Sequence, residues 1–281
     1  MSRSGMIGCV RGRGSPVTEP PAATSGECGP GAAIELHNVV CRAGPAGGGD
    51  SGAAGVSLQV PPGQSLALRG QPQGSATALL DVLAGLRRPR AGEIRVDGVA
   101  VHRLGGREAS RYRAGRGLVS PRFPLLASLP VIDNVLAAPS PARPREPGEH
   151  REPREPREPA AERAARLLEF AGVTRREVPV EQLTAEERWR VMIARALVSC
   201  PRLLLAEDPA TEVESRAVDR VLDVLMDAHA RFGFTLVLAA DRLAAAVRCE
   251  RRVSLVDGAV AEDEITGDDD GWTRGRVDRI G

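Results

Sequence analysis

The chain has 281 residues and a formal net charge of +1, and all 38 of its basic residues are arginine. This length accommodates one large α/β domain or two small ones. Because positive and negative charges nearly cancel, the global balance gives no argument for binding nucleic acid or an anionic membrane. Since the sequence contains no lysine, no ammonium side chain of this chain can reach a phosphate.

The cysteine and histidine residues are scattered along the chain. The cysteines are Cys9, Cys28, Cys41, Cys200 and Cys249, and the histidines are His37, His102, His150 and His229. Neither set has the close spacing of a zinc site, and the odd number of cysteines argues against a disulfide framework. No apolar run approaches the roughly 18 residues of a membrane span, and the N-terminus lacks the apolar core of a signal peptide. We therefore expect reduced thiols and an intracellular protein.

Apolar strands and amphipathic helices alternate along most of the chain. The expected strands are 34–40, 56–60, 66–68, 93–96, 99–101, 117–120, 203–206, 235–240, 252–256 and 259–260. The expected helices run from about 77 to 86, over 160–170, from a cap at 184 to about 199, over 218–228 and over 243–247. Hairpins are expected at Asp97-Gly98 and Asp257-Gly258, and a capping box is expected between Thr184 and Glu187. This alternation predicts a largely parallel sheet covered on both faces.

Three stretches differ from the rest in composition. Residues 1–32 are rich in Gly, Pro, Ala and Ser and are expected to be a disordered leader. Residues from about 140 to 159 contain a tandem Arg-Glu-Pro tract, which predicts a disordered, polyproline-like insert rather than a helix. Residues 263–281 are expected to form a charged tail. One domain should therefore span residues 33–262.

Residues 65–101 begin with a strand, a turn and a helix, an arrangement that suits phosphate binding. A helix N-terminus favours negative charge through its N–H groups and its dipole. The phosphate-loop pattern G-x-x-x-x-G-K-[ST] places Gly70 first, then Ser75, Ala76 and Thr77 at its last three defined positions. Two of these four positions do not match the pattern. Because strand–turn–helix units are common in α/β proteins, this stretch alone leaves the function open.

Three runs, taken together, carry a resemblance to a known family. They are ALLDVLAGLRRPRAGEIRVDGVAV, LLASLPVIDNVL and RVMIARALVSCPRLLLAEDPA. Their order and spacing resemble those of the nucleotide-binding subunits of ATP-binding cassette (ABC) transporters, of the macrolide-export and lipoprotein-release type, over about residues 34–262. The resemblance implies a P-loop NTPase-like α/β cassette with a mainly parallel sheet, an antiparallel β subdomain and a helical subdomain.

The same resemblance implies ligands, partners and a location. ATP and Mg²⁺ would be the cofactors. A membrane permease subunit and a second cassette, identical or different, would be the partners, with no nucleic acid. The protein would be cytoplasmic, and a permease would hold it at the inner face of the cell membrane.

The family's site residues carry over position by position. Those assigned to nucleotide binding are Gly70, Gly74, Ser75, Ala76, Thr77 and Thr184, those assigned to the metal are Thr77 and Glu207, and the catalytic carboxylate is Asp208. The acidic pair normally has Asp first and Glu second, and here the order is reversed. A misplacement of about 1 Å can cost on the order of a hundredfold in rate.

Many of the carried-over positions depart from the family pattern. Ala43 replaces the adenine-stacking aromatic residue, Ala76 the phosphate-loop lysine, Pro121 the glutamine, Ala240 the switch histidine, and Glu214 the aspartate of the dimer-contact loop. Pro72 removes an amide from the phosphate loop. The signature Leu-Ser-Gly-Gly-Gln is Leu-Thr-Ala-Glu-Glu at residues 183–187, and its two glutamates should repel a triphosphate.

Two hypotheses of function follow, with a third kept open. Losing one preorganised electrostatic contact costs roughly a hundred- to a thousandfold in rate, so the substitutions favour a degenerate cassette subunit that acts as a non-hydrolysing structural or regulatory partner. The alternative is an active ATPase that powers export of a small molecule or lipoprotein, in which Arg69, Arg87 or Arg88 replaces the missing lysine. A P-loop kinase or GTPase is the third possibility, although no base-reading motif supports it.

Several of the singled-out residues also have a purely structural explanation. Thr77 and Thr184 suit the first turn and the cap of a helix. Glu207 and Asp208 are equally compatible with residual Mg²⁺ binding and with solvation at a strand end. Trp189 and Tyr112 are expected to be packing residues.

Overall fold

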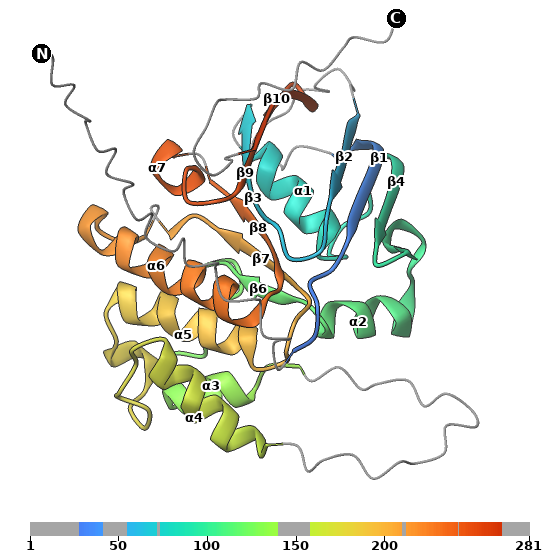
Figure 1. The fold of residues 1–281 in the computed structure, drawn as a ribbon. Helices are drawn as coiled ribbons and strands as arrows, with labels where there is room; N and C mark the ends of the chain where they lie inside the picture. Colours follow the sequence, from blue (N-terminus) through green and yellow to red (C-terminus); the bar gives the residue numbers. More distant parts are fainter. Residues whose placement is uncertain are drawn as a thin grey trace, which may run out of the picture.

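The protein is described by a computed structural model over residues 28–41, 55–71, 74–139, 158–209, 212–240 and 242–265. Two sheets form its framework (Figure 1). The smaller sheet is antiparallel, with the order β2-β1-β4-β5 and the strands β1 (Ile34–Val40), β2 (Val56–Val60), β4 (Ala91–Val96) and β5 (Val99–Ala100). The larger sheet has the order β10-β9-β3-β8-β7-β6.

The larger sheet is parallel except at its β9–β10 edge. Its strands are β3 (Ser65–Gln71), β6 (Gly117–Val119), β7 (Leu203–Glu207), β8 (Thr235–Ala239), β9 (Arg251–Val256) and β10 (Ala259–Ile265). Its central strands are apolar along their length because both faces of the sheet are covered. The predicted α/β class, with a mainly parallel sheet and a separate antiparallel sheet, is confirmed.

Helices cover both faces of the larger sheet. They are α1 (Ser75–Leu83), α2 (Gly106–Ala114), α3 (Val131–Leu136), α4 (Ala160–Phe170), α5 (Ala185–Leu197), α6 (Ser215–Phe232) and α7 (Leu243–Ala246), with 3₁₀ turns at Val101–Arg103 and Val180–Gln182. Figure 1 shows α3–α6 stacked on one side, with α1 between the larger sheet and the antiparallel sheet on the other.

Alternation along β3 separates two apolar cores. Leu66 and Leu68 pack with α1 and the antiparallel sheet, whereas Ala67 packs in the core of α3–α7. Successive side chains of a strand point to opposite faces, so neighbouring residues of one strand belong to different cores. This division places α1 and its N-terminus on one defined side of the sheet.

Local sequence signals predicted several elements well. Both expected hairpins turn at Asp-Gly pairs with positive φ, +51° and +75° at Asp97 and Gly98, and +50° and +79° at Asp257 and Gly258. Helix α4 has the predicted bounds, 160–170. The prediction for α1 needs correction, because the helix begins at Ser75 and ends at Leu83. Leu86 lies beyond it and is 37% exposed, so it is not part of the helix's buried face.

The structure also changes two expected boundaries. Arg202 donates to the carbonyls of Pro30 and Gly31 at 2.7 and 2.9 Å, so packing begins before residue 33. Strand β10 continues to Ile265, where Asp263 pairs with Arg251 at 2.6 Å, so residues 263–265 are not part of a tail. Residues 1–27, 140–157 and 266–281, on which most of the leader, insert and tail predictions fall, lie outside the described residues.

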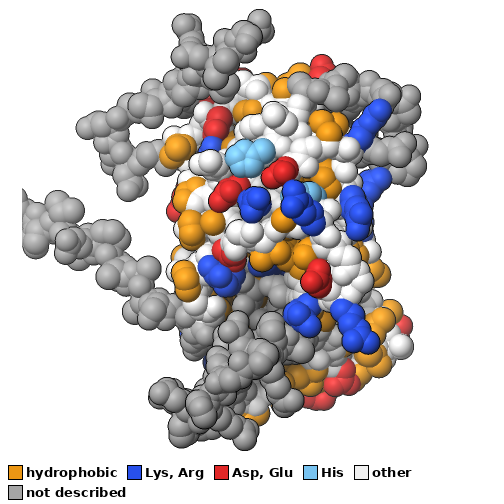
Figure 2. All heavy atoms as spheres, turned by 90° about the vertical axis from the view of Figure 1, so that its right-hand side faces the viewer, with side chains coloured by type: hydrophobic (Ala, Val, Ile, Leu, Met, Phe, Trp, Pro, Cys, Tyr) orange, Lys and Arg blue, Asp and Glu red, His pale blue; other side chains and the backbone are white. Residues whose placement is uncertain are grey.

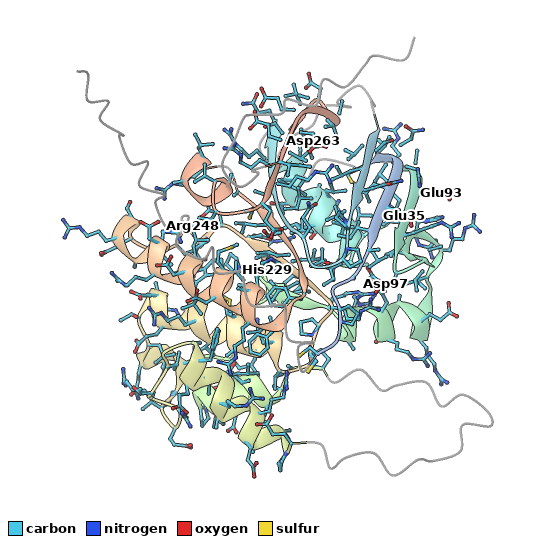
Figure 3. All side chains as sticks on the ribbon, viewed as in Figure 1. Glu35, Glu93, Asp97, His229, Arg248 and Asp263 are labelled. Carbon is cyan, nitrogen blue, oxygen red and sulfur yellow. The ribbon has the colours of Figure 1, made fainter. Side chains whose placement is uncertain are left out.

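The surface of the antiparallel sheet carries both signs of charge. Figure 2 shows arginine, acidic and histidine side chains interspersed on this face. Glu93 on β4 lies within salt-bridge distance of Arg95 and Arg103, and Glu35 lies on the neighbouring β1 (Figure 3). Within the described ranges, no helix is both long enough and apolar enough to cross a membrane.

Candidate functional site

The carboxyl ends of four parallel strands meet along one edge of the larger sheet. Pairing brings Leu68 of β3 and Glu207 of β7 against Ala239 of β8, and Val119 of β6 against Ala206. The residues that follow these strand ends therefore lie next to one another. In open α/β sheets, this edge is where ligands bind.

Gly70 and Gly74 lie on either side of the turn from β3 into α1. A Cβ on Gly70 would lie 2.6 Å from the Ala76 nitrogen, so the approach of helix to strand requires glycine there. Gly74 adopts φ +93° and directly precedes the helix, which has no side-chain cap. The first N–H groups of a helix have no intrahelical acceptor. Thr77 lies in this first turn, while Pro72 lies outside the described residues.

Three positions at which the resemblance expects polar side chains hold Ala76, Ala240 and Pro121 instead. Ala76 is 3% exposed, so a buried methyl group lies where the resemblance places the lysine. Ala240, at the switch position, is buried, and its N–H donates to the Leu68 carbonyl at 2.9 Å. Pro121 follows β6 and has no amide group to contact a metal or water. Ala43 lies outside the described residues.

None of the three arginines considered as substitutes for the lysine is placed to act as one. Arg69 lies two residues after Ala67 on β3 and so shares its face, the one opposite α1. Arg87 and Arg88 follow the C-terminus of α1, the end away from the phosphate loop. Arg88 donates to the Leu104 carbonyl at 3.3 Å, and Arg87 lies 3.9 Å from Asp81.

A different arginine, Arg122, occupies the end of the sheet. Its Nε donates to Glu207 Oε1 at 2.7 Å, and its Nη1 donates to Asp81 Oδ1 at 2.7 Å. Ser120 Oγ donates to the same Glu207 oxygen at 3.0 Å. Burial disfavours the charged guanidinium, but the hydrogen bond to Asp81 and the attraction of Glu207 outweigh it and raise the Arg122 pKa. Sequence reasoning missed this contact, and the only sequence signal was an arginine directly after Pro121.

These contacts decide whether Mg²⁺ fits the carboxylate of Glu207. Oε1 already accepts hydrogen bonds from Ser120 and Arg122, and the guanidinium supplies the positive charge that a metal would supply. The cavity whose lining includes Asp81, Arg122 and Glu207 measures about 10 Å³, room for a single water at most, whereas Mg²⁺ usually keeps several waters. The residues present therefore do not fit a metal ion at this oxygen.

Asp208 follows Glu207 and is largely buried. Only 9% of the Asp208 surface is exposed, and its backbone N–H donates to the Ala239 carbonyl at 2.9 Å. This hydrogen bond extends the pairing of β7 with β8 by one residue and holds Asp208 at the sheet edge beside the buried Ala240.

The residues at the signature position begin α5. The predicted capping box is confirmed, because the Thr184 hydroxyl accepts from the Glu187 N–H at 3.2 Å and Glu187 accepts from the Thr184 N–H at 2.8 Å. The Thr184 hydroxyl also lies 3.0 Å from Glu187 Oε2. Its hydrogen-bonding capacity is therefore used within the cap.

The negative charge at this helix end is partly compensated. Glu186 pairs with Arg190 at 2.7 Å and with Arg220 of α6 at 2.5 Å. The hydrogen bond from Arg220 is the main cause of a lowered Glu186 pKa. The repulsion of a triphosphate expected from Glu186 is therefore weaker than the sequence alone indicates.

The two aromatic residues that were expected to pack do so. Trp189 is buried in the helical core, and the Tyr112 hydroxyl donates to the Leu83 carbonyl at 2.7 Å at the end of α1.

Comparison with known proteins settles the family. Residues 53–211 match the family model described as ABC transporter. The chain belongs to the ABC transporter family. It is 32% identical over 208 residues to the lipoprotein-releasing system ATP-binding protein LolD 1 of Rhodopirellula baltica, covering 73% of this chain and 86% of that protein.

Two further likenesses agree with this family. The chain is 31% identical over 215 residues to the macrolide export ATP-binding/permease protein MacB of the same organism, covering 74% of this chain and 30% of MacB. A dimeric post-hydrolysis structure of the ATP-binding cassette MJ0796 bound to ADP and Pi superposes with a TM-score of 0.66 at 25% identity, covering 83% of this chain and 99% of that one. The ABC cassette fold inferred from the three sequence runs is thus confirmed.

Proposed function

We propose that this ABC protein is a cassette subunit that does not hydrolyse ATP and acts as a structural or regulatory partner in an export or lipoprotein-release transporter. The observation that carries this proposal is the buried Ala76 in the first turn of α1. The charge that would neutralise the terminal phosphates is missing there, and the chain has no lysine to provide it. Loss of such a contact lowers the rate by two to three orders of magnitude, at roughly 2.7–4 kcal/mol each.

If a nucleotide binds, backbone N–H groups would hold it more than side chains would. Gly70, Gly74, Ser75 and Ala76 would provide the turn and helix N-terminus, and Thr77 would provide a hydroxyl. Thr184 would contribute only by leaving its capping box. Asp208 retains a carboxylate at the sheet edge, and hydrolysis by an active ATPase, the alternative function, would depend on it.

Measurement of phosphate release together with isothermal titration of ATP tests the proposal. We expect no hydrolysis above background with or without Mg²⁺, and weak or undetectable ATP binding. An intact cassette such as MJ0796 serves as positive control. Turnover that is abolished by Asp208→Asn would establish the active alternative, because only a working site would depend on that carboxylate.

A groove beside the site supports a permease partner. It measures about 470 Å³ and lies between α2, the segment after β6, and helices α3 and α5. Its lining includes the apolar Leu118, Phe123 and Leu126 together with Arg113 and Arg116. A lining that combines apolar and basic side chains suits the apolar face of a helix with acidic ends.

The permease assignment can be tested with two matched leucines. Leu126 lines the groove and Leu243 lies on α7, and each is 55% exposed. Leu126→Asp should abolish co-purification with a co-expressed permease of the lipoprotein-release or macrolide-export type, whereas Leu243→Asp should leave it intact. Equal loss in both variants would count against this groove.

Association with a second cassette is the other part of the proposal. MJ0796 is dimeric in the structures that this fold resembles. Light scattering on the purified chain, alone and mixed with an intact cassette, would measure dimer formation. A chain that stays monomeric in both conditions would remove the dimer from the proposal.

A further inference from the structure

The Arg122 guanidinium bridges two carboxylates that come from different elements. Asp81 lies in α1 and Glu207 ends β7, and both are within 2.7 Å of Arg122 nitrogen atoms. Their side chains are largely buried, whereas Arg122 lies near the surface after β6. One planar group with several N–H donors can satisfy two carboxylates at once.

The two carboxylates need a cation between them. Each accepts a hydrogen bond from the same guanidinium, so without it two largely buried negative charges would lie on either side of the space that the guanidinium leaves. Two carboxylates that share one site disfavour each other's ionisation. Oxygen ligands from carboxylates are the ones that Mg²⁺ and Mn²⁺ prefer, and Ser120 Oγ adds a third oxygen next to Glu207.

We infer that the Arg122 guanidinium occupies the place of a divalent metal ion. It therefore prevents the carboxylate of Glu207 from binding Mg²⁺. This inference deepens the proposed function, on which it rests, because it explains how a site without metal keeps its acidic strand end buried. It also identifies Arg122 as the residue that excludes a divalent metal here.

A purely structural ion pair would make the same contacts, but it would not exclude a metal ion. If Arg122 only joins the β6 segment to α1 and β7, its removal costs stability and creates no metal affinity. If it holds the place of a metal, its removal leaves Asp81, Glu207 and Ser120 as an oxygen cluster that a divalent ion can enter.

Titration of Mn²⁺ followed by electron paramagnetic resonance separates the two. Wild-type protein should show no Mn²⁺ binding that depends on Glu207, so that Glu207→Gln leaves its titration unchanged. Arg122→Gln should raise Mn²⁺ affinity at least tenfold, and Arg122→Gln combined with Glu207→Gln should lose this gain. Arg88→Gln, which removes an arginine beyond α1, should behave as wild type.

The wild-type titration decides the matter even where Arg122→Gln does not fold, since Mn²⁺ binding that Glu207→Gln removes would overturn the inference. A folded Arg122→Gln variant without added affinity would overturn it as well. Protein that binds Mn²⁺ through Glu207 yet fails to hydrolyse ATP would leave the proposed function standing. Hydrolysis without any divalent metal would overturn the proposed function alone.

Discussion

Asp81 Oδ1 accepts a hydrogen bond from Arg122 Nη1 at 2.7 Å, although 41 residues separate the two in sequence. This contact accounts for a charged residue among the buried positions of α1, whose neighbours Leu79, Leu80 and Val82 are apolar. A buried carboxylate is tolerated when a cation and hydrogen bonds satisfy it. Helix α1 is therefore attached to the sheet edge by charge as well as by apolar packing.

Replacing Asp81 with Asn should measure this attachment. The variant keeps the shape of the side chain and loses its charge, so we expect the free energy of unfolding to fall by about 2 kcal/mol, the usual range for a hydrogen bond to a charged group. Urea denaturation would give the value. Asp223→Asn removes a carboxylate from a surface pair with Arg248, which is labelled in Figure 3, and should cost less than about 1 kcal/mol. Equal losses would argue against a special role for Asp81.

The capping box at α5 provides a second prediction. Thr184→Ala should lower the free energy of unfolding by about 1 kcal/mol, because the Glu187 N–H loses its acceptor. Thr184→Ser keeps the hydroxyl and should be close to wild type. Thermal or urea unfolding measures both variants. A Thr184→Ala protein with unchanged stability but altered ATP affinity would assign the hydroxyl to nucleotide instead of to the cap.

Local chemistry explains what the sequence predicted correctly. The Asp-Gly hairpins, the Thr184–Glu187 cap and the apolar strand 203–207 each depend on a few neighbouring residues. Helices α2 and α3 were not predicted, because they lack such local signals. Helix α2 buries only Tyr112 and α3 has six residues, so neither presents a strong helical period.

The contact at Arg122 could not be predicted by the same means. The arginines nearest to the phosphate loop in sequence are Arg69, Arg87 and Arg88. The arginine at the sheet edge comes instead from the segment after β6, which pairs in parallel with β7 and ends at the same edge. Which side chains meet there depends on strand order, and strand order is a property of the whole fold.

Restoring the lysine should not restore hydrolysis. In Ala76→Lys the guanidinium of Arg122 still donates a hydrogen bond to the carboxylate of Glu207, and Ala240 and Pro121 still provide no polar side chain. We expect phosphate release to stay at background, since each lost contact costs about a hundred- to a thousandfold. A gain in ATP affinity without turnover would come from the charge of the new lysine, and Ala76→Met, of similar bulk, is the matched control. Turnover above background in Ala76→Lys would show that the remaining substitutions matter little.

Protonation of His229 should make stability depend on pH. The ring is buried near the end of α6 (Figure 3), and its Nδ1 lies 2.9 Å from the Phe234 carbonyl oxygen, which fixes the proton of the neutral ring on Nδ1. Burial lowers its pKa below the ordinary 6.5, and the opposing effects of the Phe234 carbonyl and Glu250 are smaller. Between the lowered folded pKa and 6.5, the unfolded chain binds the proton and the folded one does not.

The stability associated with a neutral His229 is therefore fully present above pH 6.5 and is lost as pH falls toward the folded pKa. For this one proton the loss is at most about 1.4 kcal/mol per pH unit. Urea denaturation at several pH values between about 7.5 and 5 measures it, and the difference between wild type and His229→Gln isolates the residue from other titrating groups. His37→Gln removes an exposed imidazole and serves as the control. Parallel pH profiles for wild type and His229→Gln would mean that the buried ring takes up its proton in the folded state as readily as in the unfolded one.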